Sequence, residues 1–365
     1  MVAKLFLHIG LAKTGTTFLQ AVLAENRPRL REAGFIYPYV RNEGMFHAAV
    51  EVRREYDRWG LPATEIDGTF DALVTKARDF GGTAVISHEI LAGADADQVA
   101  WVADRLDGFE VHLVVTVRDL ARLLPAHWAE AVKNGHSVSF ADLTREVLRE
   151  PDAPDTVFWA SHDLGAILER WATIVPPDRV HVVVAPPRGA DKDELFRRFA
   201  SAIGLPDGAV DTEVDKPANE SLGVAEIHLL RQINSELDGS IPQPYYSRVV
   251  KRLFAQRLLG DLRSPRVLTP EQLREPLTTI AQSWVDQIRS AGYVVHGELD
   301  ELLPTEFGTT DPDDQGRPVL PGTLAVFSAA LREVAALRAE ADSAVAPQEA
   351  GSEQKPRRKR FLRRR

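Results

Sequence analysis

The sequence predicts an α/β fold in which helices cover both faces of a central parallel β-sheet, a P-loop-like three-layer α/β/α arrangement with a helical extension at its carboxyl end. Four short runs, three of them continuous in Val, Ile and Leu, are typical of strands buried on both faces; they are residues 4–9, 83–87, 110–117 and 179–185. Helical patterns separate these runs, and such alternation indicates parallel βαβ units.

The helical patterns share apolar residues at helical spacing; they are residues 16–33, 69–80, 95–106, 119–133, 139–149, 164–174 and 192–203. From about Pro206 onward we expect no further strands, because only amphipathic helices are indicated, at residues 220–237, 245–259 and 270–291. We therefore expect one α/β domain over residues 1–304, with residues 206–304 as its mainly helical part.

The remaining segments differ in composition from the domain. Residues 305–322 are rich in Pro, Gly and Asp and predict a linker. Residues 323–342 predict a single helix that docks on the body or on a partner chain, and residues 343–365 predict a disordered basic tail. The tail would solubilise the chain, touch anionic surfaces or bind nucleic acid without specificity.

Composition narrows the possible functions of these 365 residues. The last eleven residues carry eight positive charges, so the rest of the chain has a net charge of −17 against −9 in total, which argues against a specific nucleic-acid surface. The absence of cysteine excludes disulfides, zinc–thiolate sites and a cysteine nucleophile, and fits a cytoplasmic protein. The sequence contains no run of about 18 apolar residues, so we expect no transmembrane segment. The first residues predict a strand rather than a signal peptide.

The segment HIGLAKTGTTF follows the first predicted strand and leads into a predicted helix. Backbone N–H groups and the helix dipole favour an anion, most often a phosphate, at such a helix start. Gly10 and Gly15 allow the turn and a close approach of the backbone, and Thr16 and Thr17 add hydroxyl donors. Lys13 supplies a full positive charge where a leaving group would become negative.

The position of the lysine separates this loop from the common ATP- and GTP-binding loop. That loop has the pattern G-x-x-x-x-G-K-[ST], with its lysine after the second glycine. Here Lys13 precedes Gly15, and no Gly-Lys pair is followed by a hydroxyl residue to hold magnesium. We therefore expect no metal; the simpler structural alternative is a strand–turn–helix with an exposed lysine.

The string K-T-G-T-T-F-L-Q resembles the 5′-phosphosulfate loop of sulfotransferases that use 3′-phosphoadenosine-5′-phosphosulfate (PAPS), usually P-K-[ST]-G-T-T-W-L. Ala12 replaces the usual proline, and Phe18 replaces the usual tryptophan with an aromatic ring of smaller stacking area. The resemblance implies that the cofactor site includes Phe18, and that the 5′-phosphosulfate is held by Lys13, Thr14, Gly15, Thr16 and Thr17.

A second, partial match lies at the end of the strand predicted over 110–117. The family commonly holds the 3′-phosphate of PAPS with the pattern R-[DN]-P-x-x-R-x-x-S. Arg118 matches its first position, Arg122 comes one residue early, and Ala126 stands at the serine position. The missing hydroxyl removes one hydrogen bond, about 1 kcal/mol, which His127 or Lys133 could replace.

Two features of the implied cofactor site have simpler alternatives. Arg118 taken alone would form an ion pair with Asp119 or Glu130. Asn219 and Ser221 form an N-x-S element that also occurs in several bacterial sulfotransferases, where the resemblance implies a role in covering the nucleotide. Either residue could equally cap the following helix.

Sulfuryl transfer to a hydroxyl requires a base within about 3 Å of the acceptor. His88 and Glu89 follow the strand predicted over 83–87, whose carboxyl end opens on the same cleft as the Lys13 loop. By resemblance, cytosolic sulfotransferases use a His after this strand and heparan-type enzymes use a Glu. Adjacent residues of an extended segment point in opposite directions, so we expect only one to face sulfur. His47 is a third candidate, and core or surface positions are the alternative for each histidine.

A more general similarity to actinobacterial sulfotransferase-like proteins spans roughly residues 1–304. It implies a bacterial enzyme that transfers a sulfuryl group from PAPS to a hydroxyl or amine of a small-molecule or carbohydrate acceptor. The alternatives are a P-loop nucleotide kinase-like enzyme and a non-catalytic nucleotide-binding protein. The sequence leaves open the acceptor, the oligomeric state and the choice among His88, Glu89 and His47 as the base.

Overall fold

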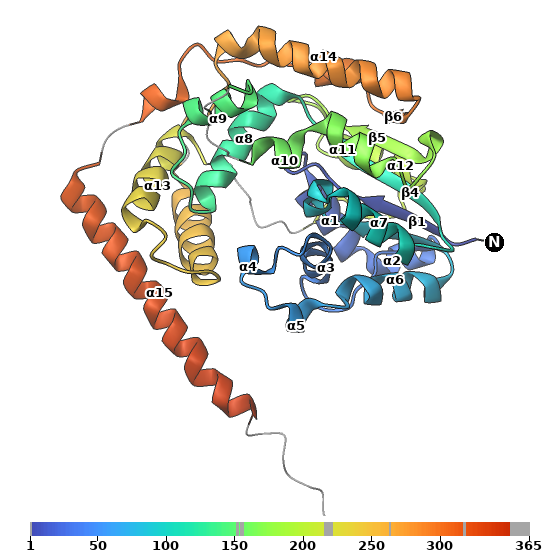
Figure 1. Ribbon diagram of the computed structural model, residues 1–365, viewed down its shortest axis with the longest axis horizontal. Helices are drawn as coiled ribbons and strands as arrows, with labels where there is room; N and C mark the ends of the chain where they lie inside the picture. Colours follow the sequence, from blue (N-terminus) through green and yellow to red (C-terminus); the bar gives the residue numbers. More distant parts are fainter. Residues whose placement is uncertain are drawn as a thin grey trace, which may run out of the picture.

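The computed structural model describes residues 2–150, 153, 157–214, 222–262, 264–316 and 319–350. It is an α/β fold built on a six-stranded sheet in which every paired strand is parallel, in the order β2-β3-β1-β4-β5-β6. The strands are β1 (Lys4–His8), β2 (Phe35–Ile36), β3 (Thr83–Ser87), β4 (Glu110–Val117), β5 (Val180–Val184) and β6 (Val294–His296). Helices lie on both sides of this sheet (Figure 1). The predicted α/β class with a parallel sheet is confirmed.

The two edge strands were not predicted. The expectation that strands end near Pro206 is wrong, because β6 pairs with β5 through His181 and Val294. With two and three residues, β2 and β6 are too short to display a periodic pattern, unlike the four predicted strands, which are all present.

Helices make up most of the remaining chain. Those up to β6 are α1 (Thr16–Glu25), α2 (Arg27–Glu32), α3 (Gly44–Arg53), α4 (Tyr56–Trp59), α5 (Ala63–Ile66), α6 (Thr69–Phe80), η1 (Glu89–Gly93), α7 (Ala96–Arg105), α8 (Leu120–Lys133), α9 (Phe140–Val147), α10 (Phe158–His162), α11 (Leu164–Trp171), η2 (Pro177–Arg179), α12 (Glu194–Ile203), α13 (Val224–Leu237), the π-helix η3 (Tyr246–Leu259), η4 (Glu271–Leu273) and α14 (Arg274–Ala291). The helix predicted over 16–33 is divided at Asn26, whose side chain donates to the backbone oxygens of Val22 and Asp211.

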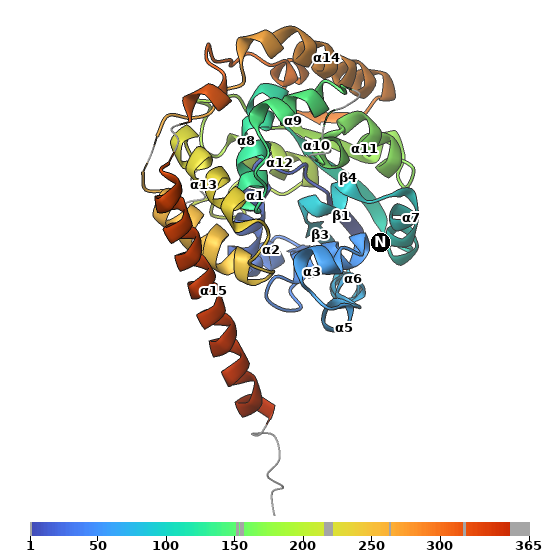
Figure 2. The ribbon, with the colours of Figure 1, turned by 60° about the vertical axis from the view of Figure 1, so that its left-hand side comes forward.

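Three more helices follow β6: η5 (Leu299–Leu302), η6 (Pro312–Gln315) and α15 (Pro321–Ala350). The helix α15 includes the predicted helix over 323–342 and packs on α13 and η3. It then extends away from the rest of the molecule (Figures 1 and 2). The basic residues 351–365 lie outside the described residues. Within the part of the chain that the structure describes, no helix has the length and apolar character needed to cross a membrane.

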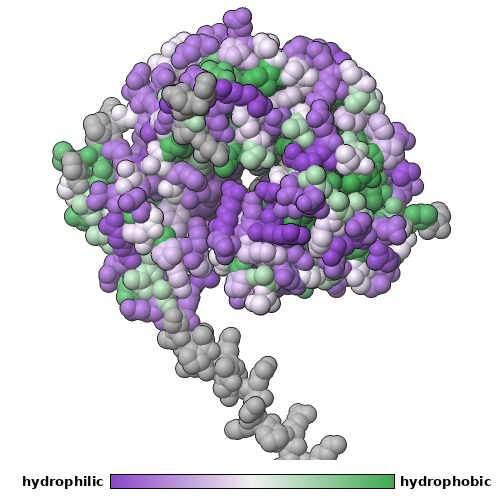
Figure 3. All heavy atoms as spheres, viewed as in Figure 1, coloured by the Kyte–Doolittle hydropathy of each residue, from purple (hydrophilic) through white to green (hydrophobic). Residues whose placement is uncertain are grey.

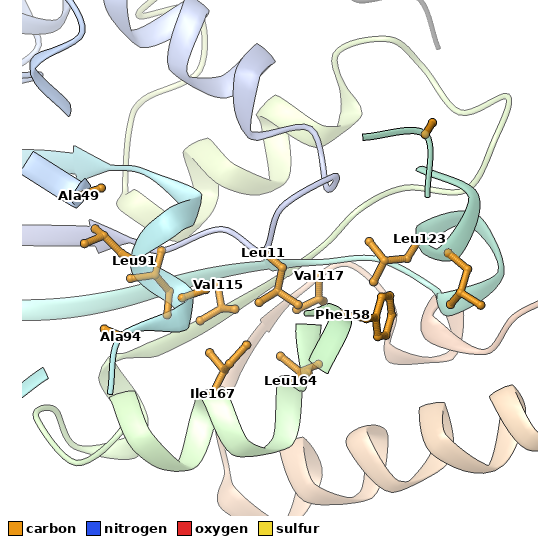
Figure 4. Packing of buried hydrophobic residues seen from close by; sticks show 14 of the residues in the cluster. Leu11, Ala49, Leu91, Ala94, Val115, Val117, Leu123, Phe158, Leu164 and Ile167 are labelled. Atoms are coloured by element: carbon orange, nitrogen blue, oxygen red, sulfur yellow. The ribbon is translucent and has the colours of Figure 1, made fainter. Parts of the chain in front are cut away.

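The sheet is buried because alternate residues of each strand enter two different hydrophobic clusters. Leu5 and Leu7 of β1 pack into the cluster under α3, α6, α8 and α11, whereas Phe6 packs into the cluster under α1 and α12. Figure 4 shows part of the first cluster, where Val115 and Val117 of β4 face Ile167 and Leu164 of α11. Burial on both faces explains the continuous apolar runs of the central strands.

Candidate functional site

The strand order reverses at β1, which lies between β3 and β4. The strands β2 and β3 lie on one side of β1, and β4, β5 and β6 lie on the other side. In open parallel sheets, ligands bind outside the carboxyl ends of the strands at such a reversal. The segment between β1 and α1, which contains Lys13, lies at this point.

A buried polar network supports the segment from below. The hydroxyl of Thr14 donates to the backbone oxygen of Leu11 at 2.6 Å and lies 2.6 Å from Oγ1 of Thr116, whose hydroxyl can therefore donate to it. Nε2 of His8 lies 3.2 Å from Thr116, and Nδ1 lies 2.8 Å from Oγ of Ser87. Because the hydroxyl of Thr116 donates to Thr14, its oxygen accepts from His8, and the ring proton of His8 is therefore on Nε2. Burial lowers the pKa of His8 to about 4, so the ring is neutral.

The sequence analysis did not single out His8. The available signal was that the apolar strands β1 and β3 each end in a polar residue, His8 and Ser87. The network joins β1, β3 and β4 to the loop, and it occupies the Thr14 hydroxyl that the resemblance assigned to the phosphosulfate. Thr16 is also buried, whereas Thr17 is exposed and Phe18 is half-buried against the cluster under α1 and α12.

The backbone of the loop adopts left-handed conformations. Lys13 has φ 65° and Gly15 has φ 97°. Gly10 has φ 83°, so both glycines adopt a backbone conformation that strains other residues. At Gly10 a Cβ atom would also lie 2.6 Å from Cβ of Glu89, and at Gly15 it would displace the end of the Leu195 side chain. The helix α1 begins after Gly15 with no side-chain cap, which leaves its first N–H groups able to bind an anion.

Arg118 lies directly against this loop. Its Nη1 donates to the backbone oxygen of Lys13 at 3.0 Å, and its buried Nε has no hydrogen-bond partner among the described residues. Burial, with the nearby Arg122, lowers the pKa of Arg118 to about 10, where it stays charged at neutral pH. The simpler alternative, an ion pair with Asp119 or Glu130, is not formed within 4 Å.

Arg118 also lines a cavity of about 680 Å³, here called the arginine cavity. Its charged lining residues among those described are Arg118, Arg122, Arg188, Arg266, Glu226 and Glu306. Arg122 is tied to Asp119 and donates to the backbone oxygen of Pro186 at 2.8 Å, and Arg188 pairs with Glu306 at 2.9 Å. Arg118 and the exposed Arg266 form no ion pair in the described chain, and of the two only Arg118 has a buried Nε without an acceptor. Arg118 is therefore the arginine best placed to meet an anion without giving up an ion pair.

Ala126 lines the arginine cavity at the position where the resembled pattern has serine. The two residues considered as replacements for that hydroxyl point elsewhere. His127 packs its ring on Phe158 and His162, and Lys133 pairs with Glu130 at 2.9 Å. Neither is among the described residues that line the cavity, so neither replaces the serine.

Three ammonium groups surround the carboxylate of Glu130. Nζ of Lys13 lies 2.7 Å from it, Nζ of Lys133 lies 2.9 Å away and Nζ of Lys251 lies 2.7 Å away. Burial alone would raise the pKa of Glu130, but the three lysines, with Lys13 foremost, hold it far below its usual range. Burial lowers the pKa of Lys13, and Glu130 opposes that shift. Sequence reasoning did not identify this cluster.

His88 lines a second cavity of about 310 Å³, here called the His88 cavity. Its other described lining residues come from α1, from α3 and the residue before it, and from η3: Gln20, Glu43, Met45, Phe46 and Arg252. The ring of His88 lies 5.5 Å from that of Phe46, and its Nδ1 accepts from the N–H of Ile90 at 3.3 Å. In the view of Figure 3, a central hollow with a mostly hydrophilic rim lies between the α3 and η3 sides of the molecule.

Glu89 lies beside His88, with 3.9 Å between its Oε2 and Nδ1 of the imidazole. The expectation that the two side chains point in opposite directions is wrong, because η1 begins at Glu89 and ends the extended geometry. Gln20 donates to Oε2 of Glu89 at 3.0 Å. Burial lowers the pKa of His88, whereas burial raises the pKa of Glu89 and His88 and Gln20 bring it below its ordinary value.

The predicted residues not yet placed are His47, Asn219 and Ser221. His47, on α3, is not among the described lining residues of either cavity; its buried Nδ1 has no hydrogen-bond partner in the described chain. Burial and then Arg41 lower the pKa of His47. Asn219 and Ser221 lie outside the described residues.

Comparisons with known proteins add no assignment: no family model matches the chain, and neither a curated protein nor a solved structure is significantly similar to it.

Proposed function

We propose that this protein is a PAPS-dependent sulfotransferase with a P-loop-like phosphosulfate loop, acting on a hydroxyl or amine of a small-molecule or carbohydrate acceptor. The observation that carries the proposal is the contact between Lys13 and Arg118. These residues come from the two motifs of the resemblance, 105 positions apart, yet the guanidinium of one donates to the backbone of the other at 3.0 Å. They meet at the reversal of strand order, beside the arginine cavity.

The two basic residues take different parts of the nucleotide in this proposal. Lys13 and the first N–H groups of α1 bind the 5′-phosphosulfate, and Nε and Nη of Arg118 bind the 3′-phosphate as a charge-assisted pair. A phosphate here would give the orphaned Nε of Arg118 its missing acceptor.

His88 is the proposed base, because burial keeps its imidazole neutral at pH 7 and it lines a cavity. For this step the ring proton of His88 lies on Nδ1, toward Oε2 of Glu89, and Nδ1 no longer accepts from Ile90. The acceptor hydroxyl then gives its proton to Nε2 of His88 while its oxygen forms a bond to sulfur. The bond between sulfur and the bridging oxygen of the 5′-phosphate breaks, leaving 3′-phosphoadenosine-5′-phosphate (PAP). Lys13 neutralises the charge that develops on this leaving group. Glu89, held by Gln20, orients His88.

Two features favour a second candidate, a nucleotide-binding protein without turnover. Lys13 is paired with Glu130, so an incoming phosphosulfate must compete with a carboxylate. Ala126 offers no hydroxyl to the 3′-phosphate. A magnesium-dependent kinase remains the third alternative and predicts a preference for ATP with Mg²⁺.

Thermal unfolding with PAP, AMP and Mg·ATP tests the proposal. We expect PAP to raise Tm more than AMP does, because only PAP carries the 3′-phosphate, and PAPS to be consumed when an acceptor library is added. Equal shifts for PAP and AMP would remove the 3′-phosphate site. A PAP-selective shift without turnover over the library would favour the binding protein, and a larger shift with Mg·ATP would favour the kinase.

A further inference from the structure

The Glu130 cluster carries more positive charge than its single carboxylate can neutralise. Lys13, Lys133 and Lys251 each lie within 2.9 Å of Glu130, which leaves an excess of two positive charges. In the described chain, no other carboxylate lies within 4 Å of these three ammonium groups. Their side chains are only 11–29% exposed, so water compensates them incompletely.

The ammonium groups also retain unused donors. Each ammonium has three N–H donors. Among the described residues, Lys13 donates only to Glu130, and Lys133 makes only its ion pair with Glu130. Lys251 donates to Glu130 and to Oδ1 of Asn134 at 2.7 Å. Partly buried donors together with uncompensated positive charge indicate that the cluster binds an anion.

The three lysines come from three different elements of the fold. Lys13 belongs to the loop that takes the nucleotide in the proposed function, Lys133 ends α8, and Lys251 lies on η3. The next residue of η3, Arg252, lines the His88 cavity, where Glu43 lies 3.4 Å from its guanidinium. The helix η3 therefore brings basic groups both to the cluster and to the cavity that contains the proposed base.

We propose that the acceptor carries an anionic group, a carboxylate, phosphate or sulfate, in addition to the hydroxyl or amine that attacks sulfur, and that Lys133 and Lys251 bind this group. The inference rests on the proposed function and names the substrate class of the same site. Glu130 holds the two ammonium groups together and prevents their mutual repulsion from separating them. Lys13 remains assigned to the phosphosulfate, so one half-buried carboxylate holds both the lysine of the nucleotide and the lysines of the acceptor.

Inorganic sulfate is the probe for this site. Thermal unfolding is measured in sodium sulfate and in sodium chloride of equal ionic strength, with the protein saturated with PAPS. We expect sulfate to raise Tm of the wild type. Lys251→Gln and Lys133→Gln should each weaken sulfate about tenfold, the loss expected for one charge-assisted hydrogen bond. Lys251→Arg keeps the charge and should retain most of the effect, and Lys192→Gln, at an exposed pair with Glu213, is the matched control.

Each other outcome counts against a different statement. A sulfate effect equal in wild type, Lys251→Gln and Lys133→Gln overturns the inference, as does no sulfate effect in the wild type. An effect present with PAP but absent with PAPS means that the lysines hold the transferred sulfuryl group, which overturns the assignment to the acceptor. Failure of both nucleotides to stabilise the wild type rejects the proposed function instead. The acceptor role then falls with it, while sulfate titration of nucleotide-free protein still decides whether the lysines bind an anion.

Discussion

The arginine cavity and the His88 cavity differ in chemistry although both open near the same loop. Among the described residues, four arginines and two glutamates line the first. The second is lined by one imidazole, one guanidinium, one carboxylate, one amide and the apolar Met45 and Phe46. The first also has about twice the volume, 680 against 310 Å³. A large cavity with fixed cations suits a phosphorylated nucleotide, and a smaller one with a neutral base suits a reacting group. The comparison therefore divides the proposed reaction between two sites, and Lys13 contacts the first through its backbone oxygen, which accepts from Arg118.

The largest effect is expected at Lys13, in the loop that the proposed function assigns to the phosphosulfate. Lys13→Ala should lower the rate of PAPS-dependent transfer by about 10²–10³, the usual cost of removing a group that stabilises the leaving charge. Measurement of kcat with a saturating acceptor tests this expectation. Lys76→Ala, on the surface helix α6, is a control that should leave kcat unchanged. Near-normal turnover by Lys13→Ala would mean that the loop does not contact the reacting phosphosulfate.

His88→Asn should lower kcat by about 10²-fold or more while leaving PAP affinity unchanged, since a general base contributes to the rate alone. The pH profile adds a second readout. Burial places the pKa of His88 below its ordinary 6.5, so the wild-type rate should stay level above that pH and fall as the solution becomes more acidic and the ring gains a proton. If the rate of His88→Asn still fell at acidic pH, the base would be Glu89 instead of His88. The variant Glu89→Gln would then test that assignment.

Arg118→Ala should act on the other cavity and weaken PAP about tenfold or more, the loss expected for a charge-assisted contact. AMP, which has no 3′-phosphate, should lose much less. Calorimetric titration of both nucleotides gives the comparison, and Arg197→Ala, at an exposed ion pair on α12, is the matched control. If Arg118→Ala lost AMP and PAP affinity equally, the guanidinium would be supporting the loop through Lys13 rather than contacting the 3′-phosphate.

The part of the site that could be predicted depends on short-range signals. Lys13 and Gly15 belong to one strand–turn–helix segment, and parallel strands end at one edge of a sheet, so β1 and β4 bring Lys13 and Arg118 together. Apolar runs predicted the four inner strands for the same reason, because each run is long enough to show its pattern.

The rest of the site depends on contacts between distant segments. Glu130 meets Lys13 across 117 positions and Lys251 across 121, and no local pattern of charges specifies those pairs. The adjacency of His88 and Glu89 depends on where η1 begins, which the extended-strand rule could not anticipate. The two edge strands were missed because two or three residues carry no measurable periodicity.

The smallest expected effect is a gain at Ala126. Its side chain lies on α8 and lines the arginine cavity, as Arg118 does just before that helix, so Ala126→Ser would add a hydroxyl to the same wall. One added hydrogen bond to the 3′-phosphate is worth about 1 kcal/mol, which corresponds to about fivefold tighter binding of PAP. AMP affinity should stay the same, and Ala129→Ser, one turn further along the same wall, controls for a general effect of serine on α8. Calorimetric titration measures both affinities. No gain for PAP, or an equal gain for AMP, would mean that position 126 does not contact the 3′-phosphate. Arg118 would then be the only residue of α8 and the turn before it that is assigned to this phosphate.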